Sequence, residues 1–465
     1  MTLAAIMFPP MQHGPTRVIA YGSNLFSQLN SLQQLNSTFT KPYTIEDAAS
    51  LVAVSTYQTI YRATSGEIKV LGESGHLLEG LIAGKGASKL TFVGQDIIEA
   101  VLDGDGRRSW FLNYNTGRVS EVEGGWKTAV SDGRGRCMAI DQEGAVYLFD
   151  STRFFRAATG DSDSAKALRK VTMFKGHAYD EAKNSLLPTT VELPKFKAIS
   201  AGSAHFVLLA AGSKLECPVW IYGDARFGAV PLTPFSNTTF VGTLSSKPSP
   251  SAQPTDVPYL MPVPHFSPLE GFPDPISDIV TGSRHTIVRT IFGDLYGWGW
   301  NEHSPLLPLN LPPKQKEVEW ENNIISEPAV MDVHLPPGPN ETQTFAFRNV
   351  AAAGGRSFAL IKAGELAVAG SNEFNTLGLA AERELKGLKE RGRKGERSFS
   401  QIKREFECVD GMQLHPDFKE CNENGERGKV MVVDVHATSL ATFLTLADRL
   451  PGSDEIRGRG VYVMD

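Results

Sequence analysis

One short pattern recurs along the whole chain and constrains its fold more than any other feature of the sequence. Each copy reads as an apolar stretch, a small turn, a second apolar stretch, a glycine turn and a third apolar stretch, which is typical of three short β-strands. In the two clearest copies the turn glycine lies eight residues after His285 and eight after Arg356. A copy with one extra residue runs from Arg108 to Gly117. The positions that we assign as equivalent to His285 in the seven copies are 58, 108, 136, 205, 285, 356 and 438.

Each end of the chain carries half of a repeat. Arg17–Asn24 resembles a third stretch without the first two, and Val432–Leu446 supplies a first half. Joined, they complete a seventh unit. A small sheet of this kind cannot bury both faces alone, but seven sheets arranged radially bury them against each other. The sequence therefore predicts an all-β, seven-bladed β-propeller that is closed by pairing the N- and C-terminal half-repeats.

The chain contains 44 glycines and 28 prolines among its 465 residues, which indicates many turns between short strands. We expect a single propeller domain over residues 1–465. Long loop insertions are expected at 151–195, 231–275, 304–348 and 380–428. Residues 231–275 contain 11 prolines, so we expect a mobile loop in which limited proteolysis cuts first.

The net charge of −6 argues against a chain that binds nucleic acid or an anionic membrane through its whole surface. The segment between Arg383 and Arg404 is an exception, with nine Lys/Arg against three Glu. It is either a solvated surface or a contact for RNA, DNA or an acidic protein. The residues of this possible basic patch are Arg391, Arg393, Lys394 and Arg397.

No pattern of catalytic residues is found. The four cysteines form no C-x-x-C pair, and the acidic run Asp103–Gly106 fits a tight turn better than a calcium loop. We therefore expect no catalytic residues, no metal and no cofactor. The chain has no apolar run of 18 residues, so we expect no transmembrane helix. No basic region precedes Gly14, so we expect no secretory signal. We expect a monomer that is located in the cytoplasm or the nucleus.

The loops after the third stretches carry the candidate contact residues. Aligning the glycines at 22, 223, 299 and 370 places an aromatic residue or a histidine four positions later, and packing between blades is the alternative role. Neighbouring positions depart from the apolar consensus, which favours exposed contacts. The candidate partner-binding residues are Arg226, Phe227, Trp300, Glu302, His303, Glu373 and Phe374.

Three segments carry a family resemblance: Gly-Ser-Arg-His-Thr at 282–286, Gly-Asp-Leu-Tyr-Gly-Trp-Gly-Trp-Asn at 293–301, and Gly-Ser-Asn-Glu-Phe-Asn-Thr-Leu-Gly at 370–378. They resemble repeats of the regulator of chromosome condensation family, whose fold is a seven-bladed β-propeller. The family's repeated histidine is present at 205 and 285 and is replaced at the other positions.

The resemblance is closest in character to the fungal alpha-tubulin suppressor group. It implies a non-catalytic scaffold that binds a small CSL-type zinc protein, in diphthamide synthesis and Elongator-dependent tRNA wobble-uridine modification. The alternative that the family implies is guanine-nucleotide exchange on a Ran-like GTPase, for which the founding member inserts a loop wedge beside the nucleotide. We identify no equivalent of that wedge in the sequence, and residues 1–14 are nearly uncharged where the founding member has a basic arm.

Overall fold

The computed structural model describes most of the repeats and part of the segments between them. The described residues are 14–25, 28–29, 38–83, 90–123, 126–153, 155–156, 169–170, 173–180, 185–212, 217–225, 228–230, 257–268, 271–301, 305–306, 324–331, 346–361, 364–372, 376–377, 408–414 and 430–448.

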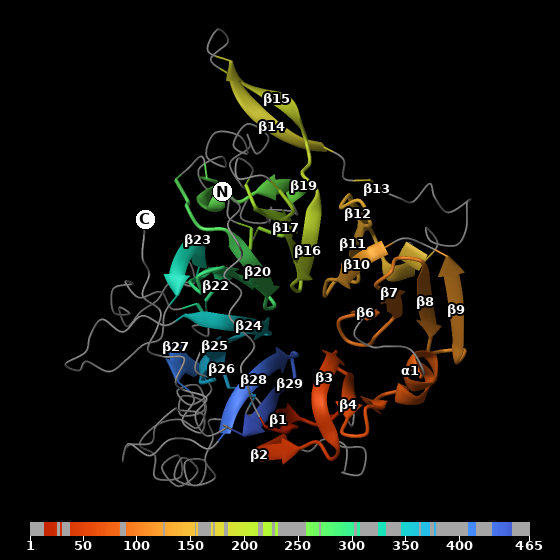
Figure 1. Ribbon diagram of the computed structural model, residues 1–465. Coiled ribbons are helices and arrows are strands. Elements are labelled where there is room, and N and C mark those ends of the chain that lie inside the picture. Colours follow the sequence, from red (N-terminus) through yellow and green to blue (C-terminus); the bar gives the residue numbers. More distant parts are fainter. Residues whose placement is uncertain are drawn as a thin grey trace, which may run out of the picture.

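Seven small antiparallel sheets are arranged radially as the blades of a propeller (Figure 1). Blade 1 contains β3 (Ala48–Val54), β4 (Gln58–Ala63) and β5 (Ile68–Gly72), and is followed by helix α1 (Gly75–Ile82). Blade 2 contains β6 (Leu90–Val93), β7 (Ala100–Asp103), β8 (Arg108–Asn113) and β9 (Arg118–Glu123). Blade 3 contains β10 (Trp126–Ser131), β11 (Cys137–Asp141), β12 (Val146–Phe149) and β13 (Arg169–Lys170).

The second half of the ring follows the same order. Blade 4 contains β16 (Phe196–Ala201), β17 (His205–Ala210), β18 (Val219–Gly223) and β19 (Val257–Pro262), followed by the short 3-10 helix η3 (Pro264–Phe266). Blade 5 contains β20 (Ile276–Thr281), β21 (His285–Thr290), β22 (Leu295–Trp300) and β23 (Ile324–Met331). Blade 6 contains β24 (Phe347–Ala353), β25 (Arg356–Ile361), β26 (Leu366–Ser371) and β27 (Cys408–Leu414).

Blade 7 is built from both ends of the described chain, which confirms the predicted closure. It contains β28 (Val430–Ala437), β29 (Ala441–Asp448), β1 (Thr16–Ser23) and β2 (Thr38–Thr44). The early strand β1 pairs with β29 in an antiparallel register that runs from Thr16 opposite Ala447 to Gly22 opposite Ala441. The ring therefore closes through strand pairing between the two ends, and the predicted seven-bladed propeller is confirmed.

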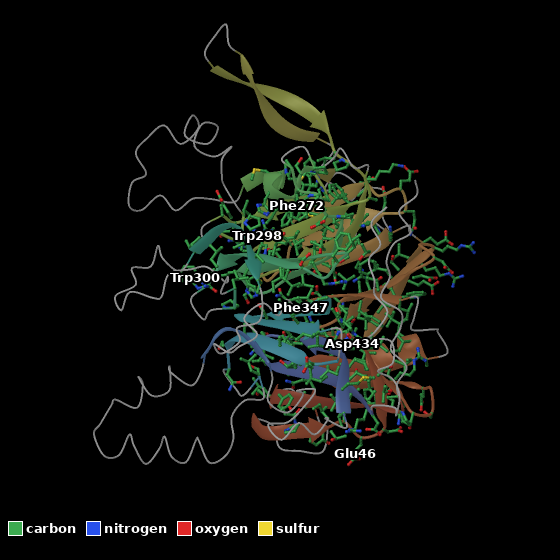
Figure 2. All side chains as sticks on the ribbon, turned by 60° about the vertical axis from the view of Figure 1, so that its left-hand side comes forward. Glu46, Phe272, Trp298, Trp300, Phe347 and Asp434 are labelled. Atoms are coloured by element: carbon green, nitrogen blue, oxygen red, sulfur yellow. The ribbon has the colours of Figure 1, made fainter. Side chains whose placement is uncertain are left out.

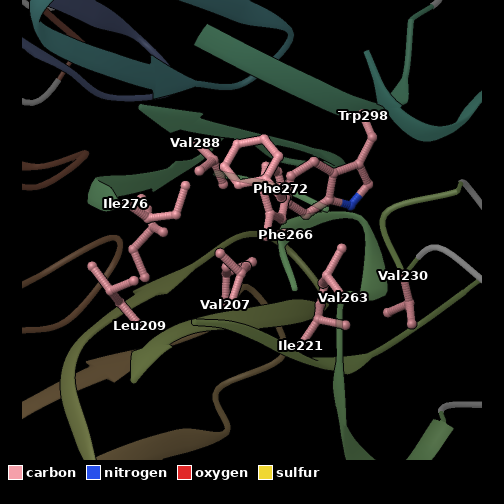
Figure 3. Packing of buried hydrophobic residues seen from close by; sticks show 12 residues of the cluster. Val207, Leu209, Ile221, Val230, Val263, Phe266, Phe272, Ile276, Val288 and Trp298 are labelled. Atoms are coloured by element: carbon pink, nitrogen blue, oxygen red, sulfur yellow. The ribbon is translucent and has the colours of Figure 1, made fainter. Parts of the chain in front are cut away.

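The core consists of apolar layers between neighbouring blades. The middle strands are continuous apolar runs, such as the fully buried β17, because both faces of each sheet are covered. Figure 3 shows the layer between blades 4 and 5, where Val207 and Ile221 face Phe266 and Trp298. The indole Nε1 of Trp298 donates a hydrogen bond to the carbonyl oxygen of Ala229 at 2.9 Å. Side chains of this size contribute about 1.5–3 kcal/mol each when they are fully buried.

The recurring glycine near the end of the third strand is required by the backbone. Gly299 pairs with His285 at the start of the second strand and has a φ of +113°. A Cβ atom there would lie 2.5 Å from the carbonyl oxygen of Arg284. Any residue with a side chain would therefore clash and be strained, which explains why the same position holds Gly22, Gly223 and Gly370.

Two of the seven positions that we assigned from the sequence as equivalent to His285 were wrong, namely 108 and 438. In blade 2 the second strand is β7, and Arg108 instead opens the third strand β8. The turn glycine of this blade is Gly106, eight residues after Ile98. In blade 7 the register places Ala441 opposite Gly22, so Ala441 rather than Thr438 corresponds to His285.

The expectation of a mobile loop over 231–275 was wrong for its second half. There β19 pairs with β18 as the fourth strand of blade 4, and Phe266 and Phe272 are buried in the layer against blade 5. Prolines 258 and 262 are compatible with this strand because it lies at the edge of its sheet, where missing N–H groups are tolerated. The expected insertions at 304–348 and 380–428 likewise contain the fourth strands β23 and β27.

One hairpin lies apart from the blades. Strands β14 (Met173–Asp180) and β15 (Ser185–Glu192) pair along their whole length and form a separate two-stranded sheet. Figure 1 shows this hairpin projecting beyond the ring. No helix in the described part of the chain is long and apolar enough to span a membrane.

Candidate binding surface

The topology brings two sets of connections to one face of the ring. Because successive strands of a blade are antiparallel, the turn after its first strand and the loop after its third strand lie at the same end. We call this end of the ring the loop face. It presents turns such as 282–284 together with the loops that begin at Asn24, Ala225, Asn301 and Asn372.

An asparagine anchors three of these loops in the same way. The side-chain Oδ1 atoms of Asn24, Asn301 and Asn372 accept hydrogen bonds from the backbone N–H five residues later, at 2.8, 2.9 and 2.8 Å. The donors belong to Leu29, Leu306 and Leu377, whose side chains are buried. The same bond therefore fixes the start of each loop against its blade, and the three loops begin in the same way.

Replacing Asn301 with alanine is expected to destabilise the protein by about 1 kcal/mol, because it removes one buried hydrogen bond and leaves the N–H of Leu306 unpaired. Backbone amide exchange should rise at Leu306 before it rises elsewhere. The matched control is Asn113→Ala, which removes a similar bond to Thr116 in an exposed turn and should have a smaller effect. Equal losses in chemical denaturation for the two variants would contradict the anchoring role.

The residue that opens the second strand connects its blade to the next. In blade 1 the Oε1 atom of Gln58 accepts from the N–H of Ile98 in blade 2 at 2.9 Å. In blade 4 the Nε2 atom of His205 lies 3.1 Å from the hydroxyl of Thr286 in blade 5. His285 repeats this contact with Ser357 in blade 6 at 3.1 Å. Arg136 and Arg356 donate to the carbonyl oxygens of Ala204 and Thr438 at 3.0 and 2.6 Å.

These contacts give the recurring histidine a structural role. Burial lowers the pKa of His205 to about 3 and that of His285 to about 4. Both rings are therefore neutral near pH 7, and neither has the pKa near neutrality that a general acid or base requires. The repeat histidines join blades, as do the glutamine and arginine side chains that replace them.

Blades 3 and 4 are joined by a charged cluster at the loop face. The Nε atom of Arg136 donates to the buried carboxylate of Asp132 at 2.7 Å, and burial raises the pKa of that carboxyl group. The guanidinium of Arg136 also lies 5.6 Å from the ring centres of Phe206 and Tyr222. Arg134 pairs with the buried Asp224, which holds an exposed arginine in a fixed position on this face.

A cavity of about 270 Å³ lies where the first strands and first turns of all seven blades converge. Its described lining is uncharged and includes the hydroxyl groups of Ser55, Ser200, Thr281 and Ser439. Ser200 and Thr281 already bond to each other at 2.8 Å. The cavity thus offers hydrogen-bonding groups without charge, and it suits a small polar group better than an ion.

Of the candidate contact residues, the structure describes Trp300 alone. It is the half-buried last residue of β22, pairs with Ile324, and donates its backbone N–H to Arg284 at 2.9 Å. Figure 2 shows it farther out than Trp298. The remaining candidates lie outside the described residues: Arg226, Phe227, Glu302, His303, Glu373, Phe374 and the basic patch Arg391, Arg393, Lys394 and Arg397.

Sequence reasoning missed Arg134, Asp132 and Asp224. The run Asp-Gly-Arg-Gly-Arg at 132–136 was the available signal, because clustered charges beside a strand start suggest fixed ion pairs. Within the described ranges, no group of three or more His, Cys, Asp or Glu side chains could hold a metal ion.

The strand order of the sheets defines the protein as a seven-bladed β-propeller. The model of the regulator of chromosome condensation (RCC1) repeat matches residues 276–304, the most regular copy of the pattern. This match confirms the resemblance to the repeat over residues 276–304.

Solved structures share the fold at low sequence identity. Prp20p from Saccharomyces cerevisiae, described with its binding properties to Gsp1p and histones, is 13% identical with a TM-score of 0.57, over 96% of this chain and 95% of that one. Yeast RCC1 (Prp20) bound by Kap60 is 12% identical with a TM-score of 0.55, over 98% and 93%. Human WBSCR16 is 12% identical with a TM-score of 0.49, over 94% and 100%. No curated protein sequence matches the chain.

Proposed function

We propose that this protein is a non-catalytic scaffold that binds another protein on its loop face. The observation that carries the proposal is the shared anchoring of the loops at Asn24, Asn301 and Asn372. A rigid ring that presents variable loops in fixed positions is a common arrangement for recognition. The neutral, buried histidines and the charged cluster at Asp132 are explained by contacts between blades.

The contact surface that we propose consists of the loops that follow these anchors. It includes Trp300, Arg226 and Phe374, together with Phe227, Glu302, His303 and Glu373. Tryptophan and arginine are frequent at the energetic centre of interfaces. The basic residues Arg391, Arg393, Lys394 and Arg397 extend the surface for an acidic partner.

Replacing Trp300 or Arg226 with alanine is expected to weaken partner binding by about 1–3 kcal/mol, with little loss of melting temperature. The control is Val119→Ala, since Val119 is an exposed apolar residue on β9, the outer strand of blade 2. Calorimetric titration measures the affinities. Unchanged affinity in both variants would remove this surface from the proposal.

The partner that we propose is a small CSL-type zinc protein, and the process is diphthamide synthesis together with Elongator-dependent tRNA wobble-uridine modification, in the cytoplasm or nucleus. The support is the likeness of the repeats to the fungal alpha-tubulin suppressor group. Affinity copurification of the full chain with mass spectrometry tests it. Recovery of a small zinc protein that binds the purified chain directly supports the assignment, and its absence contradicts it.

A second candidate is guanine-nucleotide exchange on a Ran-like GTPase. Two observations favour it: the structural likeness to Prp20p, which is described by its binding to Gsp1p, and the projecting β14–β15 hairpin. The direct test is nucleotide release from a Ran-like GTPase. Acceleration at substoichiometric protein, lost when residues 173–192 are replaced by a short Gly-Ser linker, would establish exchange and overturn the non-catalytic scaffold.

A further inference from the structure

The cavity of about 270 Å³ lies at the loop-face end of the ring axis. Its described lining is made by the last residues of the seven first strands and by several of the turns that follow them. These strands, β3, β6, β10, β16, β20, β24 and β28, surround the centre of the ring in Figure 1. On blade 5 the lining runs from the buried Thr281 to the half-buried Ser283, so it extends from the interior to the loop face. The surface proposed for a partner protein therefore includes the mouth of this cavity.

Backbone hydrogen bonds join the turns around the mouth of the cavity. The N–H of Thr56 donates to the carbonyl oxygen of Gln95 at 3.1 Å, which joins blade 1 to blade 2. The N–H of Ser203 donates to the carbonyl oxygen of Ser283 at 2.8 Å, and the N–H of Ser283 donates to that of Gly354 at 2.8 Å. These two bonds join blades 4, 5 and 6. The shape of the mouth is therefore fixed in advance, so an entering group does not have to order it.

Gln95 is the one long polar side chain in the described lining of the cavity. Its carbonyl oxygen accepts a bond from the preceding blade as that of Ser283 does, so the two residues occupy equivalent places in their turns. The corresponding turn positions of blades 1, 4, 6 and 7 hold small residues, namely Thr56, Ser203, Gly354 and Ser439. The cavity is therefore asymmetric, with a single carboxamide on its blade 2 side.

The carboxamide of Gln95 has hydrogen-bonding capacity that the described fold does not use. Its Nε2 atom is not buried and has no partner among the described residues, and the same is true of the hydroxyl of Ser283. The Oε1 atom of Gln95 is buried near Gly133, and it too lacks a partner in the described part of the chain. A buried acceptor without a partner is destabilising. A ligand that draws this carboxamide into the cavity and pairs with it is therefore favoured.

The charge and size of the cavity favour one uncharged side chain as its occupant. The described lining contains no Asp, Glu, Lys, Arg or His, so a charged group that left water would find no opposite charge there. A carboxamide is uncharged and offers two N–H donors and a carbonyl acceptor, which complement the carboxamide of Gln95. The volume of about 270 Å³ lies just below the roughly 300–1,000 Å³ of small-molecule pockets, so the cavity suits a side chain better than a cofactor.

We propose that the partner protein inserts the side chain of one glutamine or asparagine into this cavity along the ring axis. The inference rests on the proposed function, because the inserted side chain belongs to the protein that binds the loop face. The inserted carboxamide pairs with that of Gln95 on blade 2, and the hydroxyl of Ser283 offers a second partner from blade 5. The cavity thus selects an uncharged polar residue at the centre of the interface, where a charged residue would be rejected.

The blocked tripeptide acetyl-Gly-Gln-Gly-amide is the probe, added at increasing concentration to the full chain. In NMR spectra of the nitrogen-labelled protein, the side-chain amide signal of Gln95 should shift to saturation. The signal of Gln142, an exposed glutamine in the turn between β11 and β12, should not shift. Acetyl-Gly-Glu-Gly-amide should have no effect. No shift with the Gln tripeptide, or an equal shift with the Glu tripeptide, would overturn the proposal, and acetamide that bound as tightly as the tripeptide would show that the cavity takes a free amide instead.

Gln95→Leu provides the mutational test, with Gln142→Leu as its matched control. The side chain of Gln95 forms no hydrogen bond to another described residue, so its replacement should leave the thermal melt unchanged. We expect Gln95→Leu to weaken the tripeptide about three- to tenfold, which corresponds to the loss of one hydrogen bond. The control should bind as the unmodified protein does. Undiminished binding by Gln95→Leu would refute the role of the cavity.

Ser283→Ala decides the matter if leucine disturbs the turn of blade 2. It removes only the hydroxyl, keeps the backbone bonds to Ser203 and Gly354, and should weaken the tripeptide by a similar factor. Trp300 is not part of the described lining, so Trp300→Ala should bind the tripeptide normally. If Trp300→Ala loses the partner protein while Gln95→Leu and Ser283→Ala keep the tripeptide, the proposed function stands and the inserted side chain is wrong.

Discussion

A variant that lacks residues 1–30 is expected to lose its cooperative thermal transition and to aggregate. The deletion removes β1, which lies between β29 and β2 in blade 7, so β2 loses the strand it pairs with and β29 keeps only its pairing with β28. It also removes Val18, Ile19, Tyr21 and Leu29, which are buried in the layers on either side of this blade. Their burial corresponds to roughly 6–12 kcal/mol, which is comparable to the whole stability of a typical domain.

The control is a deletion of residues 1–13, which ends before β1 and should melt as the full chain does. Circular dichroism and light scattering measure the two outcomes. An unchanged, cooperative melt after removal of residues 1–30 would show that the ring does not depend on pairing between β1 and β29.

Acid is expected to destabilise the protein through its two buried histidines. In an unfolded chain a histidine binds a proton near pH 6.5, whereas in the folded protein His205 and His285 stay neutral down to about pH 3 and 4. Between these values the unfolded state binds more protons, so stability falls as the pH falls below 6.5. The loss is about 1.4 kcal/mol per pH unit for each group, or about 4 kcal/mol in total by pH 5.

The double variant His205→Gln/His285→Gln isolates this contribution. Gln58 shows that glutamine at the equivalent position of blade 1 forms the contact with the next blade. We expect the variant to fold and to lose much less stability between pH 7 and pH 5, as measured by chemical denaturation at each pH. A pH dependence as steep as that of the unmodified protein would mean that other groups, such as the carboxylates, control acid unfolding.

The sequence predicts the propeller because its defining residues are dictated locally. Gly299 is required by a positive φ and by the approach of the Arg284 carbonyl, and both requirements recur at the equivalent glycines. The failures occur where local signals compete. In blade 2, the apolar runs 100–102 and 109–112 are both followed by a glycine turn, so the pattern matched the third strand instead of the second.

The candidate surface is predicted less completely than the fold. Aligning the glycines identified the loops after the third strands, but the Asn301 anchor depends on a bond to a backbone group five residues later. The contact of His285 is with Ser357, 72 residues away on another blade, and periodicity within one repeat carries no information about it. The paired hairpin over 173–192 was likewise expected only as part of a long loop insertion.

The pairing of β1 with β29 has a consequence for how the protein is made. Arg17 and its partner Asp448 are 431 residues apart, so a ribosome that adds about 5–20 residues per second needs roughly 20–90 s between them. During that interval β1 and β2 are synthesised and can pair with each other, but β29, the other strand that pairs with β1, is absent. Strand β1 is synthesised long before β29 and is thus among the last strands to be fully buried, so a newly made chain depends on protection from aggregation until β29 arrives.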